Sequence, residues 1–78
     1  MTDERLIIAL FRVELDAIVN LDTPLDILHM DSLDFVDLML KVENAFNVKI
    51  PQESIVRMNT VGDILSVVAE ARSVSLPS

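Results

Sequence analysis

Apolar residues recur at helical spacings in three stretches of this chain, and Pro24 and Pro51 fall between these stretches. In the first stretch, Leu6, Leu10 and Val13 follow one another at intervals of four and three residues, which line up on one face of a helix. No run of alternating apolar and polar residues is long enough to build a sheet. The pattern therefore predicts an all-α fold.

Capping residues and chain breakers predict where the helices begin and end. Thr2 is a candidate N-cap for a first helix that ends near Asn20. Residues 21–30 form a linker in which a proline interrupts any regular helix, while apolar side chains hold it against the bundle. We expect Asp31 to be the N-cap of the second helix, with Asp34 at the third helical position as an acidic variant of the capping box.

The second helix carries two neighbouring apolar rows and one polar row. The apolar rows predict a broad buried face, and they consist of Leu33, Val36 and Leu40, and of Phe35, Met39, Val42 and Phe46. The row expected to face solvent consists of Asp34, Asp37, Lys41 and Asn44. Asn47 suits the left-handed residue that ends a helix.

Two shorter patterns follow the second helix. Residues 52–58 allow at most about two helical turns, with Ile55 and Met58 facing inward. Thr60 and Asp63 have the spacing of a capping box, which predicts that a last helix begins there.

Three longer helices and one short helix, with a long loop between the first two, predict a small four-helix bundle. We expect one domain over residues 1–72 and a flexible tail over residues 73–78. A domain of this size buries only about 60 to 65% of the surface that its unfolded chain exposes, so its stability margin is thin. There is little room in it for a deep active site.

Charge and composition exclude several classes of function. The net charge of −7 argues against binding to nucleic acid or to an anionic membrane surface, and it leaves basic proteins as partners, although such charge also serves solubility. We expect no stable membrane insertion. The chain has no cysteine, which excludes disulfides and thiolate metal sites. Its apolar run LIIALF is too short to span a bilayer, and the acidic start lacks the basic lead of a signal peptide. We expect a cytoplasmic monomer.

The segment DSLDFVDLMLKVENAFNVKIP, followed after seven residues by NTVGDI, resembles an acyl carrier protein. The tripeptide Asp31-Ser32-Leu33 is common by itself, and its neighbours make the pattern specific. They are Asp34 and Asp37, then Ile50-Pro51 at 18 and 19 residues after the serine, and Thr60-Val61 at the start of the last helix. The resemblance runs from the first helix to about residue 72.

The resemblance implies that Ser32 carries 4′-phosphopantetheine through a phosphodiester, and that the thiol of this arm holds an acyl or aminoacyl group as a thioester. A helix N-terminus is a suitable seat for a phosphate, although Asp31 and Asp34 compete for the same positive end. A phosphopantetheinyl transferase would modify Ser32, and acyl-transferring, ligase or synthase enzymes with basic patches would then bind the carrier. The chain itself would not be an enzyme.

The resemblance and the polar row also predict which residues recognise partners. The acids expected to face basic patches are Asp31, Asp34, Asp37 and Glu43. The apolar candidates, which would touch partners beside the arm or line a cavity for a short acyl chain, are Leu33, Val36 and Met39. Core packing is the competing interpretation for these apolar residues, and we favour it for Met39.

Some residues depart from the pattern of carriers that serve fatty-acid synthesis. Their second helix is usually densely acidic in its later half, where this chain has Lys41, Asn44, Ala45, Asn47 and Lys49. A glycine commonly stands three residues before the serine, where this chain has His29. We interpret His29 as a surface residue without a role; the alternative is a pH-sensitive contact with the acids or the phosphate. These departures favour a specialised carrier in a fatty-acid, polyketide or related pathway.

Other classes of function fit the residues less well. A serine hydrolase would need His29, Ser32 and a carboxylate to form a triad, but the chain has no GxSxG motif. Metal binding by the aspartates near Ser32 lacks the spacing of a calcium loop. The main alternative is an unmodified acidic helical interaction module, for which Ser32→Ala would leave function intact.

Overall fold

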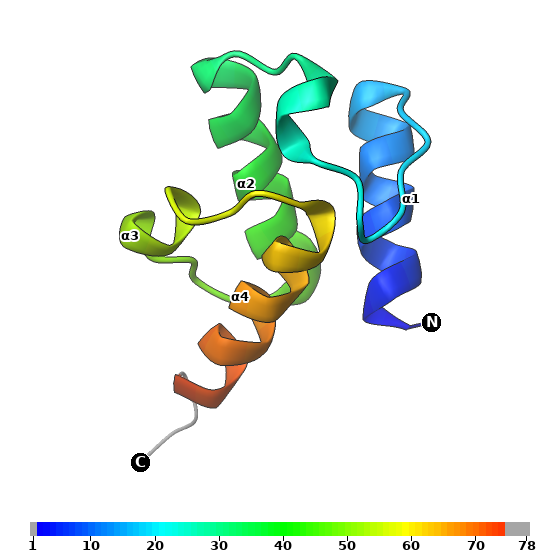
Figure 1. Cartoon of the computed structure of the whole chain (residues 1–78). Coiled ribbons are helices and arrows are strands. Elements are labelled where there is room, and N and C mark those ends of the chain that lie inside the picture. The colour runs from blue at the N-terminus through cyan, green and yellow to red at the C-terminus, as the bar shows by residue number, and fades with distance from the viewer. Residues whose placement is uncertain (1, 75–78) are drawn as a thin grey trace.

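The computed structural model describes residues 2–74 and contains helices but no strand in that range. The elements are α1 (Asp3–Leu15), the 3₁₀ helix η1 (Leu25–Leu28), α2 (Ser32–Phe46), α3 (Gln52–Ile55) and α4 (Val61–Val74). Figure 1 shows the long loop between α1 and α2, with η1 within it. α1 packs against both α2 and α4. The predicted four-helix bundle, with three longer helices and one short helix, is confirmed.

α1 begins where the sequence predicts but ends earlier. The Thr2 hydroxyl accepts the Arg5 N–H at 3.2 Å and caps the helix. The helix ends at Leu15 because Asp16 adopts left-handed dihedral angles, φ 53° and ψ 36°. The predicted end near Asn20 is therefore wrong.

The apolar residues after Asp16 explain this error, because they continue the sequence pattern after the backbone has left the helix. Val19 is buried without belonging to a helix, whereas Ile18 is 82% exposed. The Ala17 N–H bonds back to the Phe11 carbonyl at 3.3 Å, which closes the end of α1.

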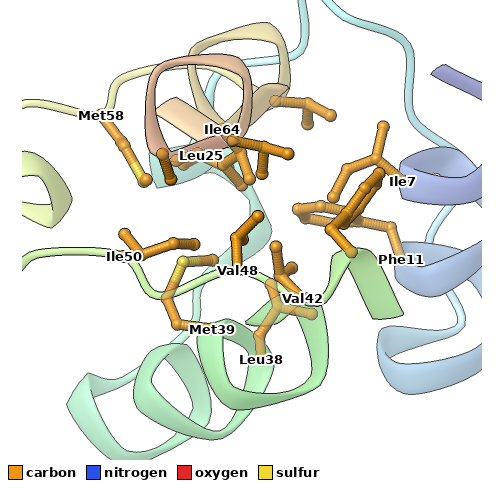
Figure 2. Close-up of a cluster of buried hydrophobic side chains, with 14 of the residues drawn as sticks. Ile7, Phe11, Leu25, Leu38, Met39, Val42, Val48, Ile50, Met58 and Ile64 are labelled. Carbon is orange, nitrogen blue, oxygen red and sulfur yellow. The ribbon is translucent and has the colours of Figure 1, made fainter. Parts of the chain in front are cut away.

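The core lies where α1, α2 and α4 meet, and Figure 2 shows Ile7 and Phe11 of α1 pointing toward the side chains of α2. The largest fully buried side chains are Ile7, Phe11, Leu38, Val42, Val61, Ile64 and Val68. Ile50 and Met58 close the core beside α3. The predicted inward direction of Met58 is thus confirmed, and Ile55 is partly buried against the same core.

The buried face of α2 differs from the predicted one. Leu33 is 80% exposed, Val36 54% and Leu40 52%, so the prediction that this row is buried is wrong. Leu38, which belongs to neither predicted row, is only 1% exposed. The buried arc of α2 therefore runs through the row Phe35, Met39, Val42 and Phe46 and extends on its other side to Leu38.

Residues 21–25 run alongside residues 59–62, and these two segments form what we call the loop clamp. Pro24 and Thr60 are bridged in antiparallel fashion. Three backbone hydrogen bonds join the segments, from Leu25 N–H to Asn59 O at 2.8 Å, from Val61 N–H to Thr23 O at 3.0 Å, and from Gly62 N–H to Leu21 O at 2.8 Å. The linker thus caps the first turn of α4. Leu25 is buried, as expected for a packed linker, whereas Ile27 is exposed.

The capping box of α4 is confirmed in full. Thr60 Oγ1 accepts the Asp63 N–H at 3.2 Å, and Asp63 Oδ2 accepts the N–H of Thr60 at 3.0 Å and that of Asn59 at 2.8 Å. The hydrogen bond from Asn59, followed by that from Thr60, lowers the pKa of the Asp63 carboxyl. α4 continues through Val74, so it includes the first two residues of the predicted tail, and residues 75–78 lie outside the described range.

Candidate functional site

Ser32 is the first residue of α2, and its side chain is exposed. Asp31 is the N-cap, as predicted: its Oδ1 accepts the Asp34 N–H at 2.8 Å, and its carbonyl accepts the Phe35 N–H at 3.0 Å. The Ser32 hydroxyl therefore stands in solvent at the positive end of the α2 dipole.

The first turn of α2 leaves two amides for an anion. In the described part of the chain, the N–H groups of Ser32 and Leu33 have no protein acceptor. Exposed amides of this kind are suited to a phosphate group attached next to them. The carboxylate of Asp34 makes no hydrogen bond to the Asp31 N–H within residues 2–74, so only half of the predicted capping box forms here. The residues present therefore fit a phosphodiester on the serine.

His29 ends η1 in a left-handed conformation, with φ 53° and ψ 36°. Glycine adopts this conformation without strain, which gives a physical reason for the glycine that the resemblance led us to expect at this position. The His29 side chain is exposed, and no hydrogen bond joins it to Ser32 among the described residues. A catalytic pair of these two residues has no support in this geometry.

The acids near Ser32 differ in their surroundings. Asp34 and Asp37 are exposed on the outward face of α2. Asp37 Oδ2 lies 4.0 Å from Lys41 Nζ, which in turn lies 3.2 Å from Glu14 Oε1 on α1. The hydrogen bond from Lys41 to Glu14 raises the pKa of the lysine, so Lys41 is charged. Asn44 is exposed as well, and the Lys41 side chain is 44% exposed. The prediction that the row Asp34, Asp37, Lys41 and Asn44 faces solvent is confirmed.

Glu43 has an intramolecular role that the sequence did not indicate. Its Oε2 accepts the Ile50 N–H at 2.7 Å, and it is half-buried. The carboxylate thus holds the segment after α2 against the helix. No local sequence signal predicts this bond, because it spans the turn at Asn47, which adopts the predicted left-handed conformation with φ 57°.

The apolar candidates beside Ser32 divide into two groups. Leu33 and Val36 are exposed, and Leu40, the third member of the row that the spacing predicted to be buried, is exposed with them. Met39 is 3% exposed and packs in the core, so core packing is its role in this structure. Leu33, Val36 and Leu40 therefore offer apolar contact area that begins next to the serine.

A cavity of about 740 Å³ lies between the second half of α2, α3 and α4. Leu40, Glu43, Ser54, Arg57 and Val67 are among the residues that line it. Ser32, Leu33, Val36 and Met39 do not line it, so this cavity is not built from the residues predicted to receive an acyl chain.

Residues 2–74 contain neither a cluster of metal ligands nor a membrane-spanning helix. No group of three or more histidines, cysteines, aspartates or glutamates is arranged to hold a metal ion there. Nor does that range contain a helix with the length and apolar character needed to cross a membrane.

Comparison with known proteins identifies the family. A family model for the phosphopantetheine attachment site matches residues 5–68. An acyl carrier protein of Zymomonas mobilis is 33% identical over 70 residues, which cover 90% of this chain and 90% of the relative. An acyl carrier protein of Streptococcus pyogenes is 40% identical over 52 residues, or 67% of this chain and 68% of the relative.

A third relative matches a shorter region. An acyl carrier protein of Thermotoga maritima is 45% identical over 42 residues, which cover 54% of this chain and 52% of the relative. The family model and the relatives together assign the cofactor as 4′-phosphopantetheine and the general role as that of a carrier and not an enzyme. The chain therefore belongs to the acyl carrier protein family.

Proposed function

We propose that Ser32 is the attachment site of 4′-phosphopantetheine and that this chain delivers acyl or aminoacyl groups to partner enzymes of a specialised pathway. The observation that carries the proposal is the exposed Ser32 hydroxyl at the first residue of α2, beside two amides that have no acceptor among residues 2–74. When attached, 4′-phosphopantetheine supplies a long arm whose terminal thiol holds the acyl group as a thioester.

The residues of this chain have a limited part in the loading reaction. Ser32 Oγ gives its proton to a base of the transferase and bonds to the phosphorus that carries the pantetheine in coenzyme A. The pyrophosphate P–O bond breaks, and adenosine 3′,5′-bisphosphate leaves with the bridging oxygen. A phosphopantetheinyl transferase catalyses this step. The amides of Ser32 and Leu33 are available to offset the negative charge of the phosphodiester, against the repulsion of Asp31 and Asp34.

Partner recognition combines charge with a small apolar contact. We propose that Asp31, Asp34 and Asp37 attract the basic patches of the transferase and of acyl-transferring, ligase or synthase enzymes, while Leu33 and Val36 contact them beside the arm. Charge complementarity raises association rates, and a small apolar contact allows rapid dissociation. A carrier that visits several enzymes in turn needs both properties.

Two of the predicted recognition residues make contacts within the chain. Glu43 Oε2 accepts the Ile50 N–H and Met39 lies in the core, so we propose that both contribute less to partner contact than the acids and apolar residues nearer Ser32. We propose that Leu40, 52% exposed in line with Leu33 and Val36, extends the apolar contact instead.

The proposal of a specialised pathway is supported by residues outside the serine motif. The later part of α2 and the turn after it carry Lys41, Asn44 and Lys49, where carriers of fatty-acid synthesis are usually acidic. Enzymes whose basic surface is adapted to a long acidic helix would therefore gain little electrostatic attraction from the later part of α2. The reactions we favour belong to a fatty-acid, polyketide or related pathway with its own partner enzymes.

Loading in vitro tests the proposal. The purified chain is incubated with coenzyme A and a broad-specificity phosphopantetheinyl transferase, and intact masses are recorded for the wild type and for Ser32→Ala. Because Ser32 is exposed and alanine favours helices, the variant should remain folded, which circular dichroism verifies. We expect one phosphopantetheine on the wild type and none on the variant.

A different result would favour the alternative role. If the folded wild type gains no mass, a dedicated transferase is tested next, and a chain that no transferase loads is better described as an unmodified acidic interaction module. In that case a partner-binding assay should give the same affinity for the wild type and Ser32→Ala.

A further inference from the structure

The outward face of α2 changes charge along its length. Near Ser32 it presents three exposed acids, which are Asp31 at the N-cap and Asp34 and Asp37 within the helix. Farther along, the polar row continues with Lys41 and Asn44, and Lys49 is exposed beyond the end of the helix. Glu43 adds little free negative charge to this face because it is half-buried and bonded to the backbone.

Lys41 is the residue at which this change occurs. Its Nζ lies 3.2 Å from Glu14 Oε1 of α1 and 4.0 Å from Asp37 Oδ2. The Glu14 side chain is 26% exposed and that of Asp37 is 66% exposed, so the shorter contact is also the better shielded one. Glu14 thus holds the ammonium group between α1 and α2, beside the carboxylate of Asp37. A partner that approaches Asp37 also meets this cation.

We infer that Lys41, held by Glu14, is a specificity-determining residue that confines the acidic docking surface to the first turns of α2. This inference rests on the proposed docking role of that helix. With a rise of about 1.5 Å per residue, Asp34 lies about 3 Å from Ser32 along the axis and Lys41 about 14 Å from it. If the basic patch of a partner enzyme covers only the region around Ser32, the charged side chains of α2 that it meets are acids. If the patch extends farther along the helix, it also meets Lys41.

This arrangement disfavours some partners and leaves others unaffected. Like charges placed opposite each other across an interface suppress the wrong partners, and this repulsion acts mainly on the association step. The lysine is therefore expected to act against enzymes whose cationic surface extends along α2, and to leave the attachment chemistry at Ser32 unchanged.

Loading kinetics with coenzyme A test the inference. The enzyme is a broad-specificity phosphopantetheinyl transferase that also loads carriers with a long acidic second helix, so its cationic surface is expected to extend along α2. The variants are Lys41→Gln, which removes the cation, and Glu14→Gln, which removes the group that holds it. Arg12→Gln is the matched control for Lys41→Gln, because it also removes one positive charge, at an exposed residue of α1. Arg12 stands two residues from Glu14 and hence about 200° around the helix, away from α2.

At low ionic strength we expect Lys41→Gln to raise kcat/KM by about three- to tenfold, through a lower KM, because Asp37 is freed for the transferase. Glu14→Gln should lower kcat/KM about two- to threefold, because the lysine is then balanced by Asp37 alone. Arg12→Gln should have little effect. The differences should disappear in about 1 M salt, where the Debye length is about 3 Å.

Two results would overturn the inference. One is an unchanged or lower kcat/KM for Lys41→Gln, and the other is an equal change for Lys41→Gln and Arg12→Gln, which would mean that only net charge matters. Failure of the proposed function looks different, because then no protein, the wild type included, would gain phosphopantetheine. All variants should fold, since exposed ion pairs contribute little to stability, and circular dichroism verifies this.

Discussion

Replacing Gly62 with alanine tests whether the start of α4 holds the loop between α1 and α2. A Cβ at Gly62 would lie 2.9 Å from the carbonyl oxygen of Leu21 and 3.4 Å from the Leu21 Cβ. The same carbonyl accepts the Gly62 N–H at 2.8 Å. The added methyl would therefore push away the group that caps the helix. Gly62 has no positive φ, so the effect comes from this close approach and not from the backbone conformation.

Two opposing contributions determine the size of the effect. Alanine favours a helix over glycine by about 1 kcal/mol in a helix interior, which would stabilise the variant. Displacing Leu21 disturbs the three backbone hydrogen bonds of the loop clamp, each of which contributes about 1 kcal/mol. The losses exceed the gain, so we expect Gly62→Ala to lower the free energy of unfolding by about 1 to 2 kcal/mol, or to lower Tm by about 5 to 15 °C.

Thermal unfolding followed by circular dichroism measures this difference. Ser66→Ala is the matched control, because Ser66 is exposed on the same helix and its replacement should change stability by no more than about 0.5 kcal/mol. A Gly62→Ala variant as stable as the wild type, or more stable, would refute the role that we assign to the loop clamp.

Three further predictions concern stability. In urea unfolding, Leu38→Ala should lower the free energy of unfolding by about 2 to 5 kcal/mol and Leu33→Ala by about 0.5 kcal/mol or less, because only Leu38 is buried. Equal losses would contradict the assignment of the buried face of α2. His29→Gly should raise stability by up to about 1 kcal/mol by relieving a left-handed residue, and a less stable variant would show that the histidine makes a compensating contact. Because the pKa of Asp63 is lowered in the folded state, its contribution to the free energy of unfolding is present above its ordinary pKa of 3.8. This contribution is lost as pH falls through the lower folded value, so the Tm of Asp63→Asn should fall less steeply in acid than that of the wild type.

The starts of the helices were predictable because their signals are local. Asp31 caps α2, and Thr60 with Asp63 caps α4, through hydrogen bonds that span three residues. Asn47 ends α2 in the left-handed conformation for which asparagine is suited. These bonds depend on a few neighbouring residues, so a single sequence contains enough information to place them.

The end of α1 and the faces of α2 were less predictable because they depend on tertiary structure. Ala17, Ile18 and Val19 extend an apolar pattern past Asp16, although the helix ends at Leu15. Leu33, Val36 and Leu40 have helical spacing, but spacing alone cannot show which of two adjacent rows meets the other helices.

No local sequence signal predicts the contacts that Glu43 and Lys41 make. Glu43 bonds to Ile50 across a turn, and Lys41 bonds to Glu14 across two helices. The sequence placed both Glu43 and Lys41 on or beside a solvated row, and only their partners in space distinguish them. In contrast, the motif alone predicts Ser32 as the attachment site, and the structure places this serine, exposed, at the first residue of α2.

The central claim is that Ser32, and no other serine, receives the cofactor. Tandem mass spectrometry of peptides from the loaded protein locates the modification, with Ser32→Ala and Ser66→Ala loaded in parallel. The account predicts one phosphopantetheine on Ser32 in the wild type and in Ser66→Ala, and none in Ser32→Ala. A phosphopantetheine on another serine, or a loaded Ser32→Ala, would contradict it.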